Sequence, residues 1–178
     1  YWLETPTHRV LFDTGQGMAL QSNAEKLGID LTAADAIVLS HGHYDHIGGL
    51  AGVLKVAPRA GLWLHPRAVE AKFTVDAAGV ARRISRPVME QRSFGPPERR
   101  VEMTAQAGEV VPGIWVTGEI PRTNDFEDTG GPFFLDAALT TPDPLEDDQA
   151  LYFEGAAGWV VVLGCAHAGV INTLDHVQ

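Results

Sequence analysis

The sequence predicts a single α/β domain that spans residues 1–178. Three observations lead to this prediction. Short apolar runs typical of buried strands alternate with helix-like stretches, a cluster of metal-ligand residues directly follows one of these runs, and two later runs read as a hairpin around glycines. The length is enough for one sizeable core, and no apolar run approaches the ~20 residues that cross a bilayer. We therefore expect one layered domain.

The first half of the chain is predicted to alternate between strands and helices. Its apolar runs predict strands at 1–4, 9–12, 36–39 and 61–65. Helices are expected at 23–27, with Ser22 as N-cap and Gly28 as the stop, at 48–56, and from Pro66 to Phe73. The first residues already look like a strand and the chain begins with Tyr1, so we expect the sequence to start inside a domain.

The second half is predicted to contain more loop. The segment from Asp76 to Arg100 is rich in proline, glycine and arginine and is interpreted as short strands and loops, with an active-site flap as one role. Two short strands are expected around 109–118, followed by a long irregular stretch at 119–148, which is typical of a functional loop. A hairpin at 149–153 and 159–163 and a helix at 170–176 complete the chain.

Composition narrows the classes of partner. Thirteen basic and 23 acidic residues give a net charge of −10, which argues against nucleic acid and against anionic membrane surfaces. A small-molecule substrate is expected instead, and a bound metal would allow that substrate to be anionic. The single cysteine, Cys165, rules out an internal disulfide, so the cytoplasm is the expected compartment.

A candidate metal site follows the apolar run 36–39. It contains His41, His43, Asp45 and His46. Imidazole nitrogens and carboxylate oxygens are preferred zinc ligands. In a turning segment, His41 and His43 can converge on one ion while Asp45 and His46 face a second position. Four such residues after a buried strand favour a metal site over unrelated surface histidines, because their burial without an ion would be costly.

This motif resembles the His-x-His-x-Asp-His signature of the metallo-β-lactamase superfamily, and the resemblance covers nearly the whole chain. It implies an αββα sandwich, here without its first strands and its C-terminal part. It implies one or two Zn²⁺ ions, with Mn²⁺ and Fe²⁺ as alternatives. His41, His43 and His167 would hold the first ion, and Asp45 and His46 the second. Asp13 would buttress the ligand loop. The family's last histidine ligand has no counterpart up to Gln178, so the chain is expected to be a fragment.

A narrower resemblance is carried by the segments 117–122, 147–151 and 164–173. They are similar to metal-dependent hydrolases related to the dihydropterin–ribofuranosylaminobenzene phosphate synthase of methanopterin biosynthesis. The resemblance implies a hydrolase that uses a metal-activated water, with Asp45 both ligating a metal and orienting the nucleophile. A pterin-coupling transferase and a metal-binding pseudo-enzyme remain alternatives. His43 stands where the di-iron redox branch has Glu, which disfavours that branch, and the acidic charge disfavours a nucleic-acid-processing enzyme.

Other residues have two interpretations each. Arg122, Asn124 and Phe126 lie on a loop after a strand and are candidates for substrate contact, with a surface salt bridge as the alternative for Arg122. Cys165 is interpreted as a small buried residue that closes a strand, with a soft ligand or a reactive thiol as the alternative. His65 is interpreted as a hydrogen-bonded structural residue, with a place in the pocket lining as the alternative. The segment 130–134 is interpreted as a hydrophobic lid or a packed loop. The acidic run 143–148 is interpreted as solvated surface without a metal role.

Overall fold

The structure is a computed structural model that describes residues 1–86, 94–128 and 130–178. Residues 87–93 of the predicted strand-and-loop segment 76–100 lie outside the described residues. Within the described ranges, no helix has both the length and the apolar character needed to cross a membrane.

A five-stranded sheet forms the centre of the molecule. Its order is β1-β2-β3-β4-β7, with β1 antiparallel to β2 and the other neighbours parallel. The strands are β1 (Trp2–Glu4), β2 (Arg9–Phe12), β3 (Ala36–Val38), β4 (Gly61–Leu64) and β7 (Val101–Met103). All three residues of β3 are fully buried, as expected for a parallel strand covered on both faces. The end of β3 is therefore held in place on both sides.

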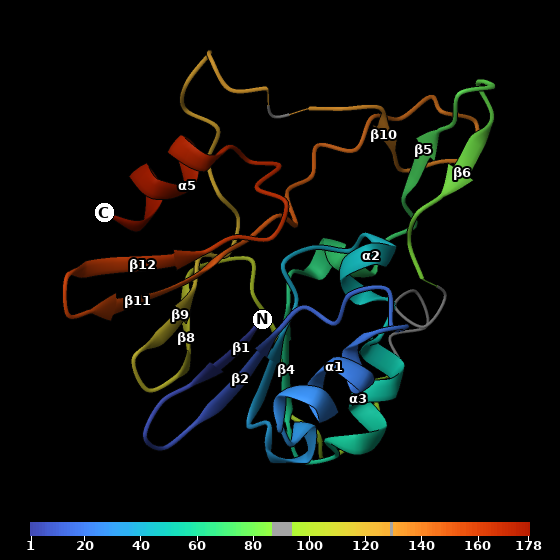
Figure 1. The fold of residues 1–178 in the computed structure, drawn as a ribbon. Coiled ribbons are helices and arrows are strands. Elements are labelled where there is room, and N and C mark those ends of the chain that lie inside the picture. Colours follow the sequence, from blue (N-terminus) through green and yellow to red (C-terminus); the bar gives the residue numbers. More distant parts are fainter. Residues whose placement is uncertain (87–93, 129) are drawn as a thin grey trace.

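Helices cover one face of this sheet (Figure 1). They are α1 (Leu20–Leu27), the 3₁₀ turn η1 (Leu31–Ala33), the short α2 (Tyr44–Ile47) and α3 (Leu50–Val56). Leu11, Ile37 and Leu62 of the sheet pack in one core cluster with Leu50 and Val53 of α3. The helix predicted at 48–56 thus begins two residues later and follows a separate turn of helix that carries the ligand loop.

A second sheet covers the other face (Figure 1). It is antiparallel, with the order β12-β11-β9-β8, from β8 (Gly108–Val111), β9 (Ile114–Val116), β11 (Leu151–Gly155) and β12 (Gly158–Val162). Phe12 and Val38 of the first sheet pack against Val116 and Leu151 of the second. The predicted hairpin and the layered α/β class are both confirmed. Helix α5 (Val170–Val177) follows β12 through a loop.

A third, small sheet forms an arm that projects beside the ligand loop (Figure 1). It has the order β10-β5-β6, from β5 (Phe73–Val75), β6 (Ala81–Arg83) and β10 (Phe133–Phe134). The helix predicted from Pro66 to Phe73 is wrong in length, because only the 3₁₀ turn η2 (Pro66–Val69) forms before the chain enters β5. The run Phe73-Thr74-Val75 has aromatic and β-branched side chains that favour a strand.

Candidate metal centre

The ligand loop lies at the carboxyl end of β3 and leads into α2. His41 is fully buried and His43 is 5% exposed. Gly42, between them, leaves no room for a side chain, because an added Cβ would lie 2.5 Å from the Ala68 carbonyl oxygen. The central position of β3 and this tight packing fix the directions in which the two imidazoles point.

His41 and His43 converge at short range. His41 Nε2 lies 3.1 Å from His43 Nδ1. Two nitrogens bound at ~2.05 Å to one tetrahedral ion would be about 3.3 Å apart, so the pair fits a shared ion. Burial lowers the pKa of His41 well below its ordinary value and that of His43 to about 4, which keeps both rings in the neutral form that binds metals.

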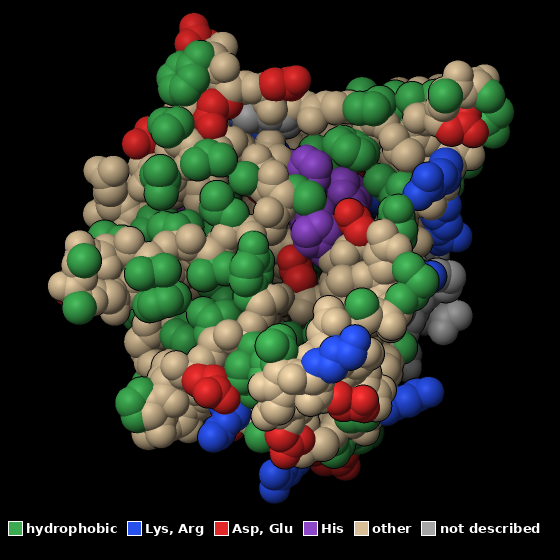
Figure 2. Space-filling view, in the orientation of Figure 1, with side chains coloured by type: hydrophobic (Ala, Val, Ile, Leu, Met, Phe, Trp, Pro, Cys, Tyr) green, Lys and Arg blue, Asp and Glu red, His purple; other side chains and the backbone are tan. Residues whose placement is uncertain are grey.

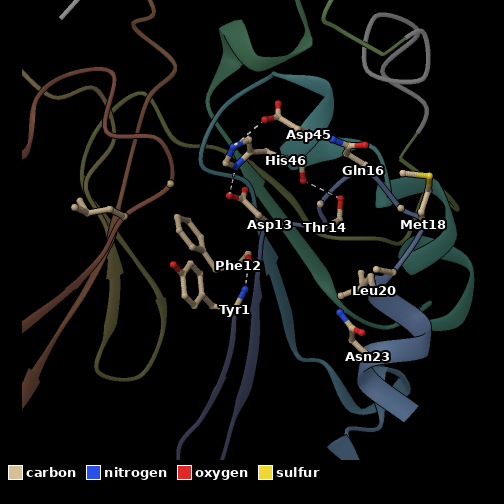
Figure 3. Close-up of a pocket in the computed structure, with 15 residues that line it drawn as sticks. Tyr1, Phe12, Asp13, Thr14, Gln16, Met18, Leu20, Asn23, Asp45 and His46 are labelled. Atoms are coloured by element: carbon tan, nitrogen blue, oxygen red, sulfur yellow. Dashed lines mark hydrogen bonds and ion pairs between the residues drawn. The ribbon is translucent and has the colours of Figure 1, made fainter. Parts of the chain in front are cut away.

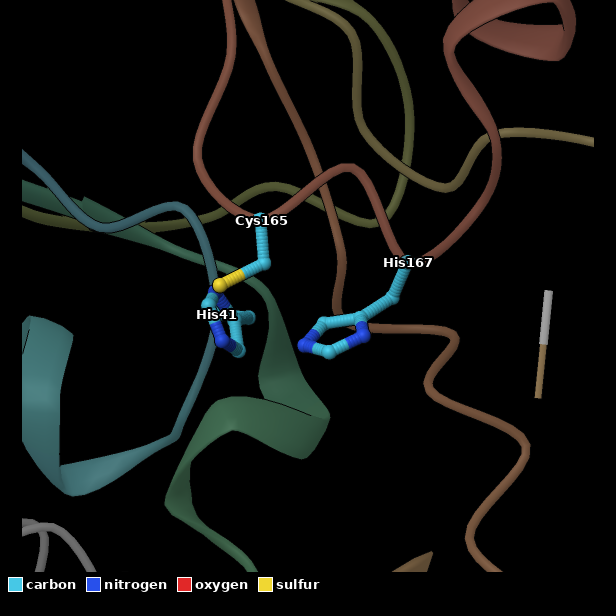
Figure 4. A group of neighbouring side chains, drawn as sticks. All are labelled: His41, Cys165 and His167. Carbon is cyan, nitrogen blue, oxygen red and sulfur yellow. The ribbon is translucent and has the colours of Figure 1, made fainter. Parts of the chain in front are cut away.

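His167 joins this pair from a distant part of the chain. Its ring centroid lies 5.0 Å from that of His41 and 5.1 Å from that of His43. His41, Cys165 and His167 form a three-donor group whose ligand atoms all lie within 4.8 Å of one another (Figure 4). The histidine side chains gather at one place on the molecular surface, beside an acidic side chain (Figure 2). The structure therefore brings the predicted ligands from 41–46 and 167 together.

The donor set fits a bound metal. The buried Nε2 atoms of His43 and His167 have no hydrogen-bond partner among the described residues. Buried polar atoms are nearly always paired, and an unpaired one costs about 1–3 kcal/mol. A divalent ion beside these rings would engage His41 Nε2, His43 Nδ1 and the unpartnered Nε2 of His167, so the arrangement fits a metal-binding site.

Asp13 holds His46 in one orientation. Its Oδ2 lies 2.6 Å from His46 Nδ1, and its two oxygens accept hydrogen bonds from the backbone N–H and the hydroxyl of Ser40, both at 2.7 Å. Burial opposes the charged imidazole, but hydrogen bonds to Asp13 and Cys165 raise the pKa of His46 to about 10. Asp13 keeps the proton on Nδ1, so a metal bound to this ring would displace the proton from Nε2, which faces the site 3.8 Å from Asp45 Oδ2. The predicted buttress role of Asp13 agrees with this geometry.

The acidic run 143–148 is not solvated surface, contrary to the prediction. Asp143, Asp147 and Asp148 are all buried, and Lys72 is fully buried beside them. Lys72 Nζ lies 2.7 Å from Asp143 Oδ2 and 3.0 Å from Asp147 Oδ1. The run of charges indicated exposure, but Lys72, 71 and 75 residues earlier in the sequence, pairs with two of its carboxylates, and Arg67 pairs with Glu146.

This segment fixes the ligand loop. Asp147 Oδ2 accepts the backbone N–H of Gly42 at 2.7 Å. Gln149 donates from its backbone N–H to Ser40 O and from its side chain to Leu39 O. Asp148 Oδ2 accepts the N–H of Ala168, which places the turn of His167. Three consecutive residues thus align both parts of the histidine cluster.

A pH dependence of stability follows from the buried ion pairs. Burial raises the pKa of Asp147, but Lys72 and the Gly42 N–H outweigh it, so the net pKa is lowered. Burial lowers the pKa of Lys72, and both carboxylates outweigh it, so the net pKa is raised. The contribution of Asp147 to the free energy of unfolding is present above its unfolded pKa of about 3.9 and is lost as pH falls through the folded pKa. That of Lys72 is present below about 10.4 and is lost as pH rises through the folded pKa.

We therefore expect that this pair makes the free energy of unfolding, measured by urea titration, fall below about pH 4. Between about pH 5 and 9 neither group titrates, so the pair should not change the pH dependence of that free energy. Asp147→Asn is expected to flatten the acid limb. An acid limb of unchanged slope in that variant would contradict the assignment.

A cavity of about 280 Å³ opens onto the histidine cluster. It is lined by His43, Tyr44, Asp45, Thr74, Arg82, Ile84, Phe133, Cys165 and His167. The ring of Phe133 lies 4.9 Å from that of His43 and 5.3 Å from that of His167, so this residue of the segment 130–134 packs against the cluster. Arg82 donates to the Tyr44 hydroxyl at 2.9 Å and places a cation at the cavity wall.

A second cavity, of about 520 Å³, shares Asp45 with the first (Figure 3). Asp13, Asp45 and His46 lie at one end of it, and Phe12, Met18 and Leu20 line its apolar part. Asp45 therefore borders both cavities, whereas His46 lines the larger one.

Three predicted substrate-contact residues lie outside the lining of both cavities. Asn124 donates to Asn172 Oδ1 and to Glu127 Oε2, which tie its loop to the start of α5. Arg122 donates to Leu145 O, and Phe126 is 70% exposed. Asn124 therefore has a structural role here, and substrate contact by these residues stays a prediction.

Two further histidine and cysteine interpretations are resolved. His65 is buried and its Nδ1 accepts the N–H of Arg67, as expected for a structural residue. Cys165 is exposed, so its interpretation as a buried residue is wrong. It follows β12 on a loop rather than within the sheet, and its Sγ lies 3.1 Å from His46 Nε2.

Comparison with known proteins agrees with this architecture. The family model described as the metallo-beta-lactamase superfamily matches residues 1–170. The chain is 28% identical over 174 residues to the 7,8-dihydropterin-6-methyl-4-(beta-D-ribofuranosyl)-aminobenzene-5'-phosphate synthase of Methanocaldococcus jannaschii, covering 92% of this chain and 58% of that protein. It is 27% identical to an uncharacterized protein of the same organism, covering 98% and 64%. The chain thus spans about three fifths of these relatives.

Solved structures show the same fold. The Rm3 metallo-beta-lactamase matches with a TM-score of 0.51 and 19% identity, over 90% of this chain and 52% of that one. BJP-1, a subclass B3 metallo-beta-lactamase of Bradyrhizobium japonicum, matches with a TM-score of 0.51 and 16% identity, over 92% and 54%.

Proposed function

The chain belongs to the metallo-beta-lactamase superfamily, and from this premise we propose that it forms the metal-binding part of an enzyme that acts on a small molecule with a metal-activated water. One observation carries the proposal: the buried imidazoles of His41 and His43 converge, and His167 joins them with an unpartnered Nε2 beside a cavity. His41, His43 and His167 would hold one Zn²⁺, and Asp45 and His46 a second. Mn²⁺ or Fe²⁺ are the alternative ions.

The residues of the chain divide the chemical work. When bound, zinc lowers the pKa of a coordinated water to about 7 and polarises the bond under attack. Asp45 has a side chain that is 44% exposed at the boundary of both cavities, where its carboxylate can accept a proton from the nucleophile and orient it. Phe133 covers the histidine rings and reduces the access of bulk water.

The cavity favours a substrate with an anionic group. Among the described residues that line it, Arg82 is the only Lys or Arg, and its guanidinium donates a hydrogen bond to the Tyr44 hydroxyl. A guanidinium at this position matches the geometry of a phosphate or carboxylate. The overall charge of −10 disfavours a nucleic-acid partner, because a protein that binds the phosphate backbone usually needs a basic face.

Hydrolysis is the leading reaction, and transfer is the second candidate. The metal-bound water and the general base Asp45 suit hydrolysis of a carbonyl or phosphoryl substrate. The similarity to a synthase that couples a dihydropterin with a ribofuranosyl-aminobenzene phosphate favours the transferase. Both reactions use the same histidines, and a metal-binding protein without turnover is the third outcome.

The test combines metal analysis with a substrate panel. We expect elemental analysis of the purified protein to find zinc, manganese or iron near stoichiometry. Turnover is expected on at least one substrate among phosphodiesters, lactones, thioesters, β-lactams and the pterin–arylamine coupling pair. His43→Ala should remove turnover and lower the amount of bound metal, whereas His8→Ala, in the turn between β1 and β2, should change neither. Purified protein without bound metal would contradict the proposal. If a chain extended to the length of its relatives binds metal but turns over none of these substrates, the protein is a metal-binding module.

A further inference from the structure

Cys165 lies between the two expected metal positions. Its Sγ is 3.1 Å from Nε2 of His46. The same sulfur belongs to the group in which the ligand atoms of His41, Cys165 and His167 lie within 4.8 Å of one another (Figure 4). The thiol therefore contacts the ring expected to hold the second ion and faces the rings expected to hold the first.

The distances suit direct coordination. Zinc binds sulfur at about 2.3 Å and imidazole nitrogen at about 2.0–2.1 Å. When both donors hold one ion, the sulfur and the nitrogen lie about 3.1 Å apart at a right angle and about 3.5 Å apart at the tetrahedral angle. The distance from Cys165 to His46 falls at the near end of this range.

A second observation points to a ligand at the same place. His167 belongs to the same three-donor group as Cys165, and its buried Nε2 has no hydrogen-bond partner among the described residues. Cys165 and His167 also line one cavity, together with the buried His43. A buried polar nitrogen is nearly always paired, so an unpaired one beside a thiol is a position where a cation would be stabilised.

The backbone holds the sulfur at the cluster. An added Cβ at Gly164 would lie 2.4 Å from the Ser40 hydroxyl oxygen, so the chain crosses the ligand loop at the closest approach a glycine permits. Ala166 adopts a φ of +55°, in the left-handed region that is uncommon for residues other than glycine. This turn separates Cys165 from His167 and allows both side chains to reach the histidine cluster.

We propose that Cys165 is a direct metal ligand that shares an ion with His46, on the side of the centre that faces His41 and His167. The inference rests on the proposed function, because it requires that the centre binds metal. On binding, the thiol releases its proton to solvent, and the resulting thiolate forms one bond to the ion. A thiolate ligand favours zinc, cobalt and cadmium over manganese and magnesium, which prefer oxygen ligands.

Cobalt substitution tests the proposal. Cys165 is the only cysteine, so any sulfur-to-cobalt charge-transfer band in the near ultraviolet arises from it. We expect this band in the Co²⁺-loaded protein and its loss in Cys165→Ser. The variant should also bind Zn²⁺ more weakly, by more than the ~10–100-fold loss that is typical when a residue hydrogen-bonded to a metal ligand is removed. The affinity for Mn²⁺ should change much less.

Two controls keep the outcomes separate. In the unaltered protein, Zn²⁺ should protect Cys165 from alkylation by iodoacetamide, and this measurement does not depend on the folding of a variant. The band should persist in His8→Ala. Bound Co²⁺ without the band, or alkylation at the same rate with and without Zn²⁺, overturns this inference and leaves the proposed function standing. Absence of any bound metal overturns both.

Discussion

Replacing Lys72 by methionine is expected to lower the free energy of unfolding by about 3–5 kcal/mol. The side chain of Lys72 is fully inaccessible, and those of its partners Asp143 and Asp147 are 1% and 0% exposed. Methionine fills a similar volume but leaves two carboxylates without a cation in a place that water does not reach. This loss of stability is larger than the net contribution of the two ion pairs, because Asp143 and Asp147 would remain buried without a cation to offset their desolvation.

Thermal and urea unfolding would measure this effect, and the melting temperature should fall by roughly 6–20 °C. Lys55→Met is the matched control, because Lys55 lies on the exposed side of α3 and should change stability by less than about 0.5 kcal/mol. Combining Lys72→Met with Asp143→Asn and Asp147→Asn should restore part of the lost stability. A loss of under about 1 kcal/mol for Lys72→Met would show that these charges are not buried together.

Replacing Asp13 by asparagine is expected to reduce Zn²⁺ affinity about 10–100-fold. Asp13 holds the Ser40 backbone, the Ser40 hydroxyl and His46 Nδ1 at once. Asparagine has nearly the same shape and tolerates the φ of +62° at this position, so the backbone should be kept. It has one acceptor oxygen and no charge, and it cannot both accept from Ser40 and fix the proton on Nδ1 of His46.

Competition of the protein with a chelator would measure the affinity. Asp35→Asn is the matched control, since Asp35 also accepts a backbone N–H, that of Arg9, but lies at the opposite end of β3 from the ligand loop. It should leave the affinity unchanged. Unaltered Zn²⁺ binding by a folded Asp13→Asn protein would show that His46 needs no anionic partner and would remove Asp13 from the metal centre.

Much of the fold was accessible to sequence reasoning because its signals are local. The apolar run before His41 indicated a buried strand, and β3 is buried on both faces. Glycines at 155 and 158 indicated the turn between β11 and β12, and Gly28 indicated the end of α1, where its φ is +70°. The helix expected from Pro66 was overestimated, because the local pattern does not show that Lys72 is held between two distant carboxylates.

The centre of the metal site was equally accessible, but its supports were not. Six residues from His41 to His46 carry four donors, and this density is visible without any structure. Lys72, Asp147 and Asp148 carry no such signal, since a lysine and an acidic run are ordinarily solvated. Their burial arises only when segments 71 and 75 residues apart in the sequence meet, as they do between Lys72 and the two carboxylates.

The sequence alone determined that this protein has an α/β fold and where its candidate metal-ligand loop lies, and the motif in that loop resembles the metallo-beta-lactamase superfamily. The fold and the loop depend on short-range patterns: apolar periodicity sets the elements, and the spacing of donors sets the loop. The tertiary structure decided which residues align those donors, which cations pair with the acidic run, and that Cys165 faces the histidines rather than the core. These outcomes depend on contacts between distant segments, whose free energies are fixed by burial and charge pairing only after the two sheets and the arm have packed.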